Sequence, residues 1–423
     1  MKPFQASIFV IFGILALAAV FIFASFSGGG ASSVGTVAIW GTVPKEQMEE
    51  LVRTVNRSVG GLDDVSYREL PAGTFLADIT DAIASGRGPD LVIIPAEAVV
   101  GSADKIIPIS YRSVSRRAFQ DAYVEAGETY LAPGGILGIP FVIDPFVMYW
   151  NRSIFSAAGI PRPLRYWDEL TDMAPRLSAA TEAGTLTRSA VALGGWDNVA
   201  YAKEVFLSLI AGLGNPAITR VEGSLVVTLA AEAESGAGAA LRFYADFADP
   251  AKDVYSWNRS RPLDREAFLA GTLAAYFAPA GEAAALRAAN PNLNFDVAAY
   301  PLTRGGAVKV PARLYAFSVP RGSKNAAGAL KTALILSGAD AQKTLAAATG
   351  LPSVRRDVLA VNPENPYDAI FRDAALNAFV FLDPDPAATD AILKTMVEDV
   401  ASGRRPVLNA VHEADAALRA LIQ

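Results

Sequence analysis

The part of this chain that most constrains its fold is residues 138–170, which read GIPFVIDPFVMYWNRSIFSAAGIPRPLRYWDEL. Two apolar runs, residues 136–143 and 146–150, meet at Asp144 and Pro145. Runs of this kind, rich in β-branched and aromatic residues, predict strands. Two strands that continue one another through a bend are what a hinge between two lobes requires. Asp144 and Pro145 are therefore predicted to be hinge residues.

The second half of this stretch carries the start and stop signals of helices. Asn151 is a candidate N-cap ahead of the apolar residues Ile154 and Phe155, and Gly159 is a stop signal. The prolines at positions 161 and 163 forbid continuation of that helix. Residues 167–170, Trp-Asp-Glu-Leu, then open a new helix with acidic side chains near its positive end.

The order of these residues resembles the extracellular solute-binding proteins of ABC importers, family 1, specifically the cluster that includes maltose-binding protein. The positions that fit the family's pattern are Gly138, Pro140, Asp144, Tyr149, Asn151, Phe155, Ala158, Gly159, Pro163 and residues 167–170. Arg152 departs from the usual Lys, and Tyr166 departs from the usual Thr or Ser cap, so that cap must be made differently. Similar shorter pieces extend the resemblance over residues 35–421.

Strands and helices alternate along most of the chain. The hydrophobic periodicity predicts strands at residues 35–40, 65–70, 90–94, 190–195, 295–301 and 310–320. It predicts helices at residues 45–59, 74–85, 200–212, 230–247, 325–336, 390–403 and 406–421. This alternation is typical of an α/β fold with a mostly parallel, doubly wound sheet.

The resemblance implies a two-lobe periplasmic-binding-protein-like fold of type II, in which mostly parallel sheets are joined by a hinge. By this analogy, lobe 1 comprises residues 35–145 plus 302–342. Lobe 2 comprises residues 146–301 plus 343–423. A chain that crosses several times between lobes permits a hinged closure around a ligand.

Composition excludes several classes of function. The net charge of −6 and the absence of any Lys/Arg cluster beyond short pairs argue against a nucleic-acid partner. The chain has no cysteine, which excludes thiol nucleophiles, disulfides and Cys-based metal sites. Its only histidine is His412, so a Ser-His-Asp triad or a multi-histidine metal site is not expected. No cofactor and no metal are predicted.

The N-terminus predicts export. Residues 8–26 are almost wholly apolar. About 19 residues at a rise of about 1.5 Å reach roughly 28 Å, close to the thickness of a bilayer core. We therefore expect residues 1–34 to be a single-pass membrane anchor followed by a Gly/Ser-rich tether, with the globular part extracytoplasmic. The alternative is a cleaved signal peptide, and the mass of the mature protein distinguishes the two.

Candidate ligand contacts come from loops, because ligands of open α/β sheets bind beyond the carboxyl ends of strands. Sugar sites place aromatic faces against the sugar ring and carboxylates or amides on its hydroxyl groups. Loops that combine these residue types give the candidates Trp40, Thr42, Glu97, Trp196, Asn198, Trp257 and Phe381. Arg313 is a further candidate, because it is a charged residue in an apolar stretch of the strand predicted at residues 310–320. The resemblance implies a sugar-contacting carboxylate at Glu97 and a late aromatic contact at Phe381.

Each candidate also has a purely structural interpretation. The tryptophans could be core residues, and Arg313 could pair with a carboxylate of one lobe. Trp150 and Trp167 belong to the structural motif and are interpreted as packing residues. Residues 278–282, Ala-Pro-Ala-Gly-Glu, lack the aromatic residue that sugar-binding relatives usually show there, which weakens a maltodextrin assignment.

Together these features predict a membrane-anchored solute-binding protein rather than an enzyme. It would capture a small polar ligand, a sugar or oligosaccharide, between its lobes and deliver it to the permease subunits of an ABC transporter as a monomer. The alternatives are a ligand-sensing domain without transport and a glycoside hydrolase that uses paired carboxylates. No carboxylate pair in the sequence sits in a motif that suggests an acid and a nucleophile.

Overall fold

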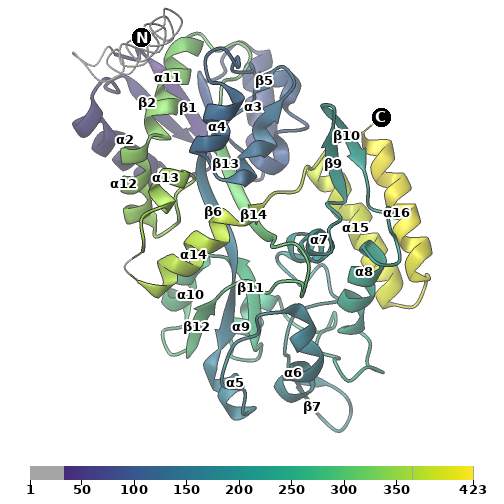
Figure 1. Ribbon diagram of the computed structural model, residues 1–423. Coiled ribbons are helices and arrows are strands. Elements are labelled where there is room, and N and C mark those ends of the chain that lie inside the picture. Colours follow the sequence, from purple (N-terminus) through teal and green to yellow (C-terminus); the bar gives the residue numbers. More distant parts are fainter. Residues whose placement is uncertain (1–32, 364, 423) are drawn as a thin grey trace, which may run out of the picture.

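The computed structural model describes residues 33–363 and 365–422 (Figure 1). The predicted anchor at residues 8–26 lies outside the described residues. Within the described ranges, we find no helix that is both long and apolar enough to span a bilayer.

One mixed sheet of eight strands runs through the molecule, in the order β11-β6-β13-β3-β1-β2, with β12 paired to β6 and β14 paired to β13. Its strands are β1 (Val37–Gly41), β2 (Val65–Glu69), β3 (Leu91–Pro95), β6 (Ile139–Asn151), β11 (Ala275–Pro279), β12 (Phe295–Ala298), β13 (Val310–Ser318) and β14 (Ala378–Phe379). Three two-stranded sheets are formed by β4 (Leu131–Ala132) with β5 (Gly135–Ile136), β7 (Ala179–Ala180) with β8 (Leu186–Arg188), and β9 (Ile218–Val221) with β10 (Ser224–Val227).

Helices cover both ends of this sheet (Figure 1). The longer ones are α2 (Lys45–Val59), α3 (Phe75–Ala84), α6 (Leu170–Leu177), α7 (Ala202–Gly212), α8 (Ala237–Asp246), α10 (Glu282–Ala289), α11 (Ala326–Leu336), α12 (Ala339–Thr349), α14 (Pro366–Leu376), α15 (Pro386–Ala401) and α16 (Val407–Leu421). The shorter ones are α4 (Arg116–Ala122), α5 (Arg152–Ala157), α9 (Asp264–Leu269), α13 (Arg356–Leu359) and the 3-10 turns η1 (Ala96–Ala98), η2 (Ala103–Lys105), η3 (Glu125–Tyr130) and η4 (Trp167–Glu169).

Two large clusters of buried apolar side chains divide the structure into two lobes. We call the cluster that contains the N-terminal strands β1 and β3 the first core, and the other cluster the second core. β6 contributes to both, because its residues up to Ile143 lie in the first core and its residues from Phe146 onward lie in the second. β13 also changes cluster, between Val310 and Leu314. Figure 1 accordingly shows β6 running from the N-terminal lobe at the top to the lower lobe. Asp144, predicted as a hinge residue, thus lies on the strand at the junction of the two cores.

The two cores also bear on the predicted lobe boundaries. Val354, Leu359 and Ala378 belong to the first core, although they fall within the range predicted for lobe 2. Leu302 packs against the second core, although it falls within the range predicted for lobe 1. The chain therefore returns to the first lobe once more before α15 and α16 complete the second. The lobe boundaries themselves remain a prediction.

The sheet departs in one respect from the mostly parallel arrangement that was predicted. Parallel pairing joins β1 to β2 and to β3, and β13 to β14. The strands that cross between the lobes pair antiparallel: β13 with β3 and β6, and β6 with β11 and β12. The reason is that β6 and β13 traverse the junction in opposite directions. Proline also shapes β6, because the register with β13 shifts where Pro140 faces Ala316.

One predicted strand is wrong, and one predicted helix begins later than expected. Residues 190–195 are not a strand, because the backbone of Val191 exchanges hydrogen bonds with the hydroxyl of Ser256, at 2.9 and 2.8 Å, instead of with a neighbouring strand. The helix predicted from residue 230 begins only at Ala237. Gly236 precedes it, and the N–H of Ala230 is held instead by the Asp415 carboxylate at 2.9 Å.

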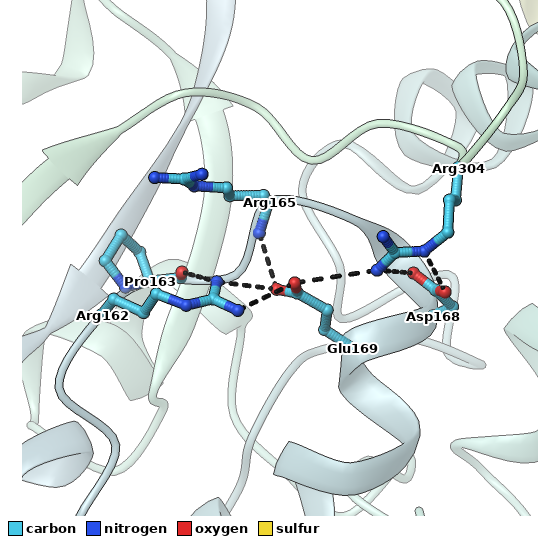
Figure 2. Close-up of polar contacts among 6 residues, drawn as sticks. All are labelled: Arg162, Pro163, Arg165, Asp168, Glu169 and Arg304. Carbon is cyan, nitrogen blue, oxygen red and sulfur yellow. Dashed lines mark hydrogen bonds and ion pairs between the residues drawn. The ribbon is translucent and has the colours of Figure 1, made fainter.

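The motif stretch forms the predicted helices, one with a side-chain cap and one without. The Asn151 side chain caps α5 by accepting the N–H of Ile154 at 3.1 Å, as predicted. Tyr166 makes no side-chain cap for η4. Instead, the Glu169 carboxylate accepts the backbone N–H of Arg165 at 2.9 Å (Figure 2). Glu169 therefore binds back to the residue that precedes the N-cap Tyr166, one position before the N–H that the glutamate of a capping box accepts, and it does not replace a Ser or Thr cap.

Arginines surround this carboxylate (Figure 2). The guanidinium of Arg162 donates to both oxygens of Glu169, at 3.1 and 3.2 Å. Arg304 pairs with Asp168 at 2.8 Å and reaches Glu169 at 3.8 Å. The hydrogen bonds from Arg162 lower the pKa of Glu169, against the opposing effect of burial. The cluster ties the start of η4 to the segment that leads toward β13.

We expect Glu169→Gln to lower the free energy of unfolding by on the order of 1 kcal/mol near pH 7. The folded pKa of Glu169 lies below its ordinary value of 4.5, so its contribution is present above that value and is lost as the pH falls through the folded pKa. Urea unfolding of both proteins across this pH range checks the prediction. Glu182→Gln, an exposed loop carboxylate, is the control. A difference that stayed constant at every pH would contradict the proposed role of the charge.

Candidate ligand-binding site

A cavity of about 310 Å³ lies where the two cores meet. Its walls come from the carboxyl end of β3, the middle of β13, the first turns of α7 and the segment after β14. The residues that carry its chemistry are Glu97, Lys203, Glu204, Arg313, Tyr315, Phe379, Phe381 and Asp383. The position agrees with the rule that open α/β sheets bind ligands beyond the carboxyl ends of their strands.

One wall of the cavity is a buried ion pair. Lys203 on α7 donates to Asp383 at 3.0 Å, and only 13% and 1% of the two side chains are exposed. Asp383 also accepts the hydroxyl of Thr389 at 2.8 Å and the N–H of Asp385 at 3.2 Å. Burial acts to lower the pKa of Lys203, but the Asp383 carboxylate reverses this and leaves that pKa raised. The carboxylate thus favours the charged form of Lys203, and the pair anchors α7 to the segment that leads into α15.

Arg313 is the exposed cation of the cavity. It lies on β13 opposite Asp144 of β6, and its guanidinium stacks over the ring of Tyr201 at 4.9 Å. Within the part of the chain that the structure describes, the guanidinium of Arg313 donates no hydrogen bond and forms no salt bridge. A planar guanidinium with five donors in a fixed fork is suited to hydroxyl and carboxylate oxygens.

Two carboxylates and a phenol complete the polar surface. Glu204 follows Lys203 on α7, Glu97 lies on η1, and Tyr315 lies two residues beyond Arg313 on the same strand. Burial raises the pKa of Glu204, and the nearby charge of Glu97 adds to that effect. Phe379 and Phe381 supply apolar surface opposite these groups. The cavity therefore combines carboxylates, a guanidinium and aromatic faces.

The predicted hinge residue Asp144 belongs to a polar network beside the cavity. Its carboxylate accepts the N–H of Gly281 at 2.8 Å, at the start of α10. Burial raises the pKa of Asp144 to about 6, opposed by the Gly281 N–H and by Arg313. Next to it, Glu282 accepts the hydroxyl of Tyr201 at 2.6 Å and pairs with Arg265 at 3.0 Å. These contacts link β6, α9 and the N-cap residue of α7 to the start of α10. The hinge role of Asp144 and Pro145 stays a prediction.

Three of the eight predicted ligand residues line this cavity. They are Glu97, Arg313 and Phe381. Glu97 lies on η1 directly after β3, Arg313 lies on β13, and Phe381 lies in the segment after β14. Only the folded chain brings them together.

Three others lie in the interior of the second lobe. Trp257 has no exposed surface, and its indole N–H donates to the Asn198 side chain at 3.0 Å. Asn198 in turn donates to the carbonyls of Asn258 and Arg261, at 2.9 and 3.0 Å. Trp196 is 5% exposed and donates to Asp390 at 3.2 Å. Trp257 and Asn198 thus hydrogen-bond each other, Trp196 hydrogen-bonds α15, and none of the three lines the cavity.

The remaining two lie near the first strand. Trp40 packs in a small apolar cluster with Phe75 and Ile79 of α3, and the guanidinium of Arg68 lies over its ring at 4.7 Å. Thr42 is partly exposed at the end of that strand. Neither residue lines the cavity.

Sequence reasoning missed Lys203, Glu204, Tyr315 and the ion-pair role of Asp383. A signal existed for the first three. Lys203 and Glu204 are the polar residues at the start of a helix that is otherwise apolar as far as Gly212, and that helix follows a candidate loop. Tyr315 shares the face of Arg313, because side chains alternate along a strand. Asp383 stands two residues after the candidate Phe381, but its pairing with Lys203 depends on partners in distant elements.

Within the described part of the chain, no group of three or more His, Asp or Glu side chains is placed to hold a metal ion.

The chain is similar to several known proteins. The family model described as bacterial extracellular solute-binding protein matches residues 57–343. Among curated proteins, the sn-glycerol-3-phosphate-binding periplasmic protein of Shigella flexneri is 23% identical over 167 residues, which are 36% of this chain and 37% of that protein. A Brucella abortus protein, strain 2308, named as a binding protein is 26% identical over 171 residues. The match with the Brucella protein covers 40% of this chain and 40% of that protein, so the matched part spans about two fifths of the relative's length.

Solved structures match over nearly the whole chain. The GacH receptor of Streptomyces glaucescens, solved unliganded and with acarbose, is 21% identical, with a TM-score of 0.72 over 93% of this chain and 99% of that one. A cyclo/maltodextrin-binding protein with maltotetraose is 15% identical, with a TM-score of 0.74 over 94% and 99%. The cyclic α-maltosyl-1,6-maltose binding protein of Arthrobacter globiformis is 17% identical, with a TM-score of 0.73 over 92% and 98%. These likenesses confirm the predicted two-lobed periplasmic-binding-protein fold.

Proposed function

This chain belongs to the family of bacterial extracellular solute-binding proteins, and from that premise we propose that it captures a sugar or oligosaccharide in the cavity between its lobes and delivers it to an ABC transporter permease. The family is one of binding proteins rather than enzymes, and no catalytic step is proposed. The ligands bound in the similar structures, acarbose and maltotetraose among them, favour a carbohydrate.

The observation that carries this proposal is the composition of the cavity. Its volume of about 310 Å³ is in the range of small-molecule sites, about 300–1,000 Å³. Arg313 and Tyr315 can donate to ligand hydroxyls, and Glu97 and Glu204 can accept from them. Phe379 and Phe381 offer ring faces to the C–H surface of a sugar. A polyhydroxylated ring needs this combination of donors, acceptors and apolar faces.

The place of the cavity supports a closing motion. Its walls belong to both cores, and the strands β6 and β13 join those cores on one side of it. A ligand that contacts both lobes stabilises the closed arrangement by its differential affinity for that arrangement. We include Asp144 and Pro145 in the proposal as the hinge. We include Glu97, Arg313 and Phe381, the predicted contacts that line the cavity, as ligand residues.

We also propose that the protein acts at the outer face of the cell membrane, tethered through residues 1–34. The support is the apolar stretch at residues 8–26 and the extracellular character of the family. The mass of the mature protein in the membrane fraction tests this part. A mature chain that began between residues 25 and 33 would overturn the anchor and leave the proposed ligand site untouched.

Titration calorimetry with the full-length protein in detergent tests the proposed site. We expect at least one mono- or disaccharide of a broad panel to bind, and Arg313→Gln to weaken that binding by on the order of tenfold or more, because one charge-assisted contact is lost. Arg321→Gln, an exposed arginine outside the cavity, is the matched control. A folded wild-type protein that binds nothing across sugars, or an Arg313→Gln variant with unchanged affinity, would contradict the proposed site.

A further inference from the structure

The charges that line the cavity do not balance. Three carboxylates, Glu97, Glu204 and Asp383, face two cations, Lys203 and Arg313. Asp144, beside Arg313 on β6, adds a further acidic group close to the same space. A partly buried site with an excess of negative charge is unfavourable unless something compensates it.

The cation on α7 is not available to a ligand. The ammonium of Lys203 donates to the Asp383 carboxylate at 3.0 Å and reaches the carbonyl of Pro386 at 3.5 Å. Because this pair is internally compensated, the cavity retains Arg313 as its accessible positive group. A phosphorylated or carboxylated ligand would therefore meet one guanidinium and two uncompensated carboxylates.

Those two carboxylates have no side-chain partner within hydrogen-bond distance in the described part of the chain. Glu204 is partly buried, and the only hydrogen bond to its carboxylate comes from its own backbone N–H. Glu97 is exposed at the turn beyond β3 and makes none. The two charges are close enough to act on each other, because Glu97 contributes to the raised pKa of Glu204. An ionised carboxylate only accepts hydrogen bonds, so the partly buried Glu204 has room for a donor from outside, and the exposed Glu97 can exchange water for the same donor.

We propose that the ligand carries a basic nitrogen: an amino sugar or a similar polyhydroxylated amine whose ammonium group lies between Glu97 and Glu204, with its hydroxyl groups on Arg313 and Tyr315. This inference rests on the proposed function of the same cavity. An ammonium group supplies three donors and a positive charge, and the hydroxyls of a neutral sugar supply donors without the charge. Phe379 and Phe381 complete the site with ring faces that suit both C–H groups and a cation.

Matched ligand pairs test the inference on the full-length protein in detergent, by titration calorimetry slightly below neutral pH. The probes are glucosamine against glucose, β-1,4-linked diglucosamine against cellobiose, and glucose 6-phosphate as the anionic counterpart. We expect the amine of each pair that binds to bind on the order of tenfold or more tightly than its neutral partner. Glucose 6-phosphate is expected to bind more weakly than glucose.

Variants locate the effect. Glu204→Gln and Glu97→Gln keep the shape of each side chain and remove its charge. We expect each to reduce the amine preference, and the double variant to bring the ratio of amine affinity to neutral-sugar affinity to within about threefold, whatever the change in the neutral-sugar affinity itself. Glu182→Gln, on an exposed loop of the second lobe, is the control and should retain the full preference.

The outcomes separate the inference from the proposed function. Binding of neutral sugars as tight as that of their amine partners would overturn the inference and leave the proposed function standing. An amine preference that survives in the double variant, or tighter binding of the phosphate, would also overturn it. A folded protein that binds no member of either pair and no other sugar would overturn the proposed function itself.

Discussion

Replacement of Asp383 by alanine is expected to lower the free energy of unfolding by about 3 kcal/mol or more, because it leaves a buried cation without its partner. Asp383 is 1% exposed and holds Lys203, the hydroxyl of Thr389 and the N–H of Asp385. All three donors lose an acceptor in the variant. Urea unfolding of the full-length protein, followed by tryptophan fluorescence, measures the loss.

The partner and a surface pair provide the controls. Lys203→Met combined with Asp383→Ala should cost less than the sum of the two single changes, because the unpaired charge is absent from the double variant. Asp121→Ala removes an exposed pair with Arg117, at 3.6 Å and 71–91% exposure, and should cost less than about 1 kcal/mol. A loss for Asp383→Ala no larger than that for Asp121→Ala would refute the assigned role.

Replacement of Trp257 by alanine is the second change with a large expected effect, about 3–5 kcal/mol of unfolding free energy. The indole is fully buried, its N–H donates to Asn198 at 3.0 Å, and the guanidinium of Arg261 lies 5.6 Å from the ring centre. Gly195 packs against the ring so closely that a Cβ there would lie 2.8 Å from Cδ1. The variant therefore leaves a cavity and an unpaired Asn198 side chain.

The same experiment separates packing from ligand contact. Trp40→Ala, in the small and partly exposed cluster under α3, should cost less than Trp257→Ala. Trp257→Phe keeps most of the apolar volume and should bind ligand as the wild type does at a temperature where it is folded. A Trp257→Phe variant of full stability that has lost ligand binding would show that this side chain contacts ligand after all.

The sequence predicted the local elements well where their signals are local. The helix predicted at residues 45–59 is α2 with the same bounds, and the Asn151 cap is made as expected. Strands β1, β2 and β3 begin and end within two residues of their predicted positions. Such signals work because caps, glycine stops and apolar periodicity act within a few residues.

The site was predicted less completely, for a physical reason. A tryptophan beside polar residues has the same sequence pattern whether its polar neighbours face a ligand or hydrogen-bond the indole, as Asn198 does for Trp257. Glu97, Arg313 and Phe381 were distinguished from Trp196 and Trp257 only by the positions of their elements after folding. Period-two alternation on β13 could have added Tyr315 to Arg313.

The amino-acid sequence by itself determined the class of this protein: the strand, bend and helix order of residues 138–170, with its prolines and glycines, predicts two lobes joined through β6. The tertiary structure alone decided which charges meet. Glu97, Lys203, Arg313 and Asp383 lie on four separate segments, and whether a carboxylate is paired or free depends on distances between those segments. The strength of an electrostatic interaction depends on the distance between the charges in space and not on their separation along the chain. The pairing of Lys203 with Asp383, and the lack of a side-chain partner for Glu97 and Glu204 in the same cavity, therefore became visible only in the folded molecule.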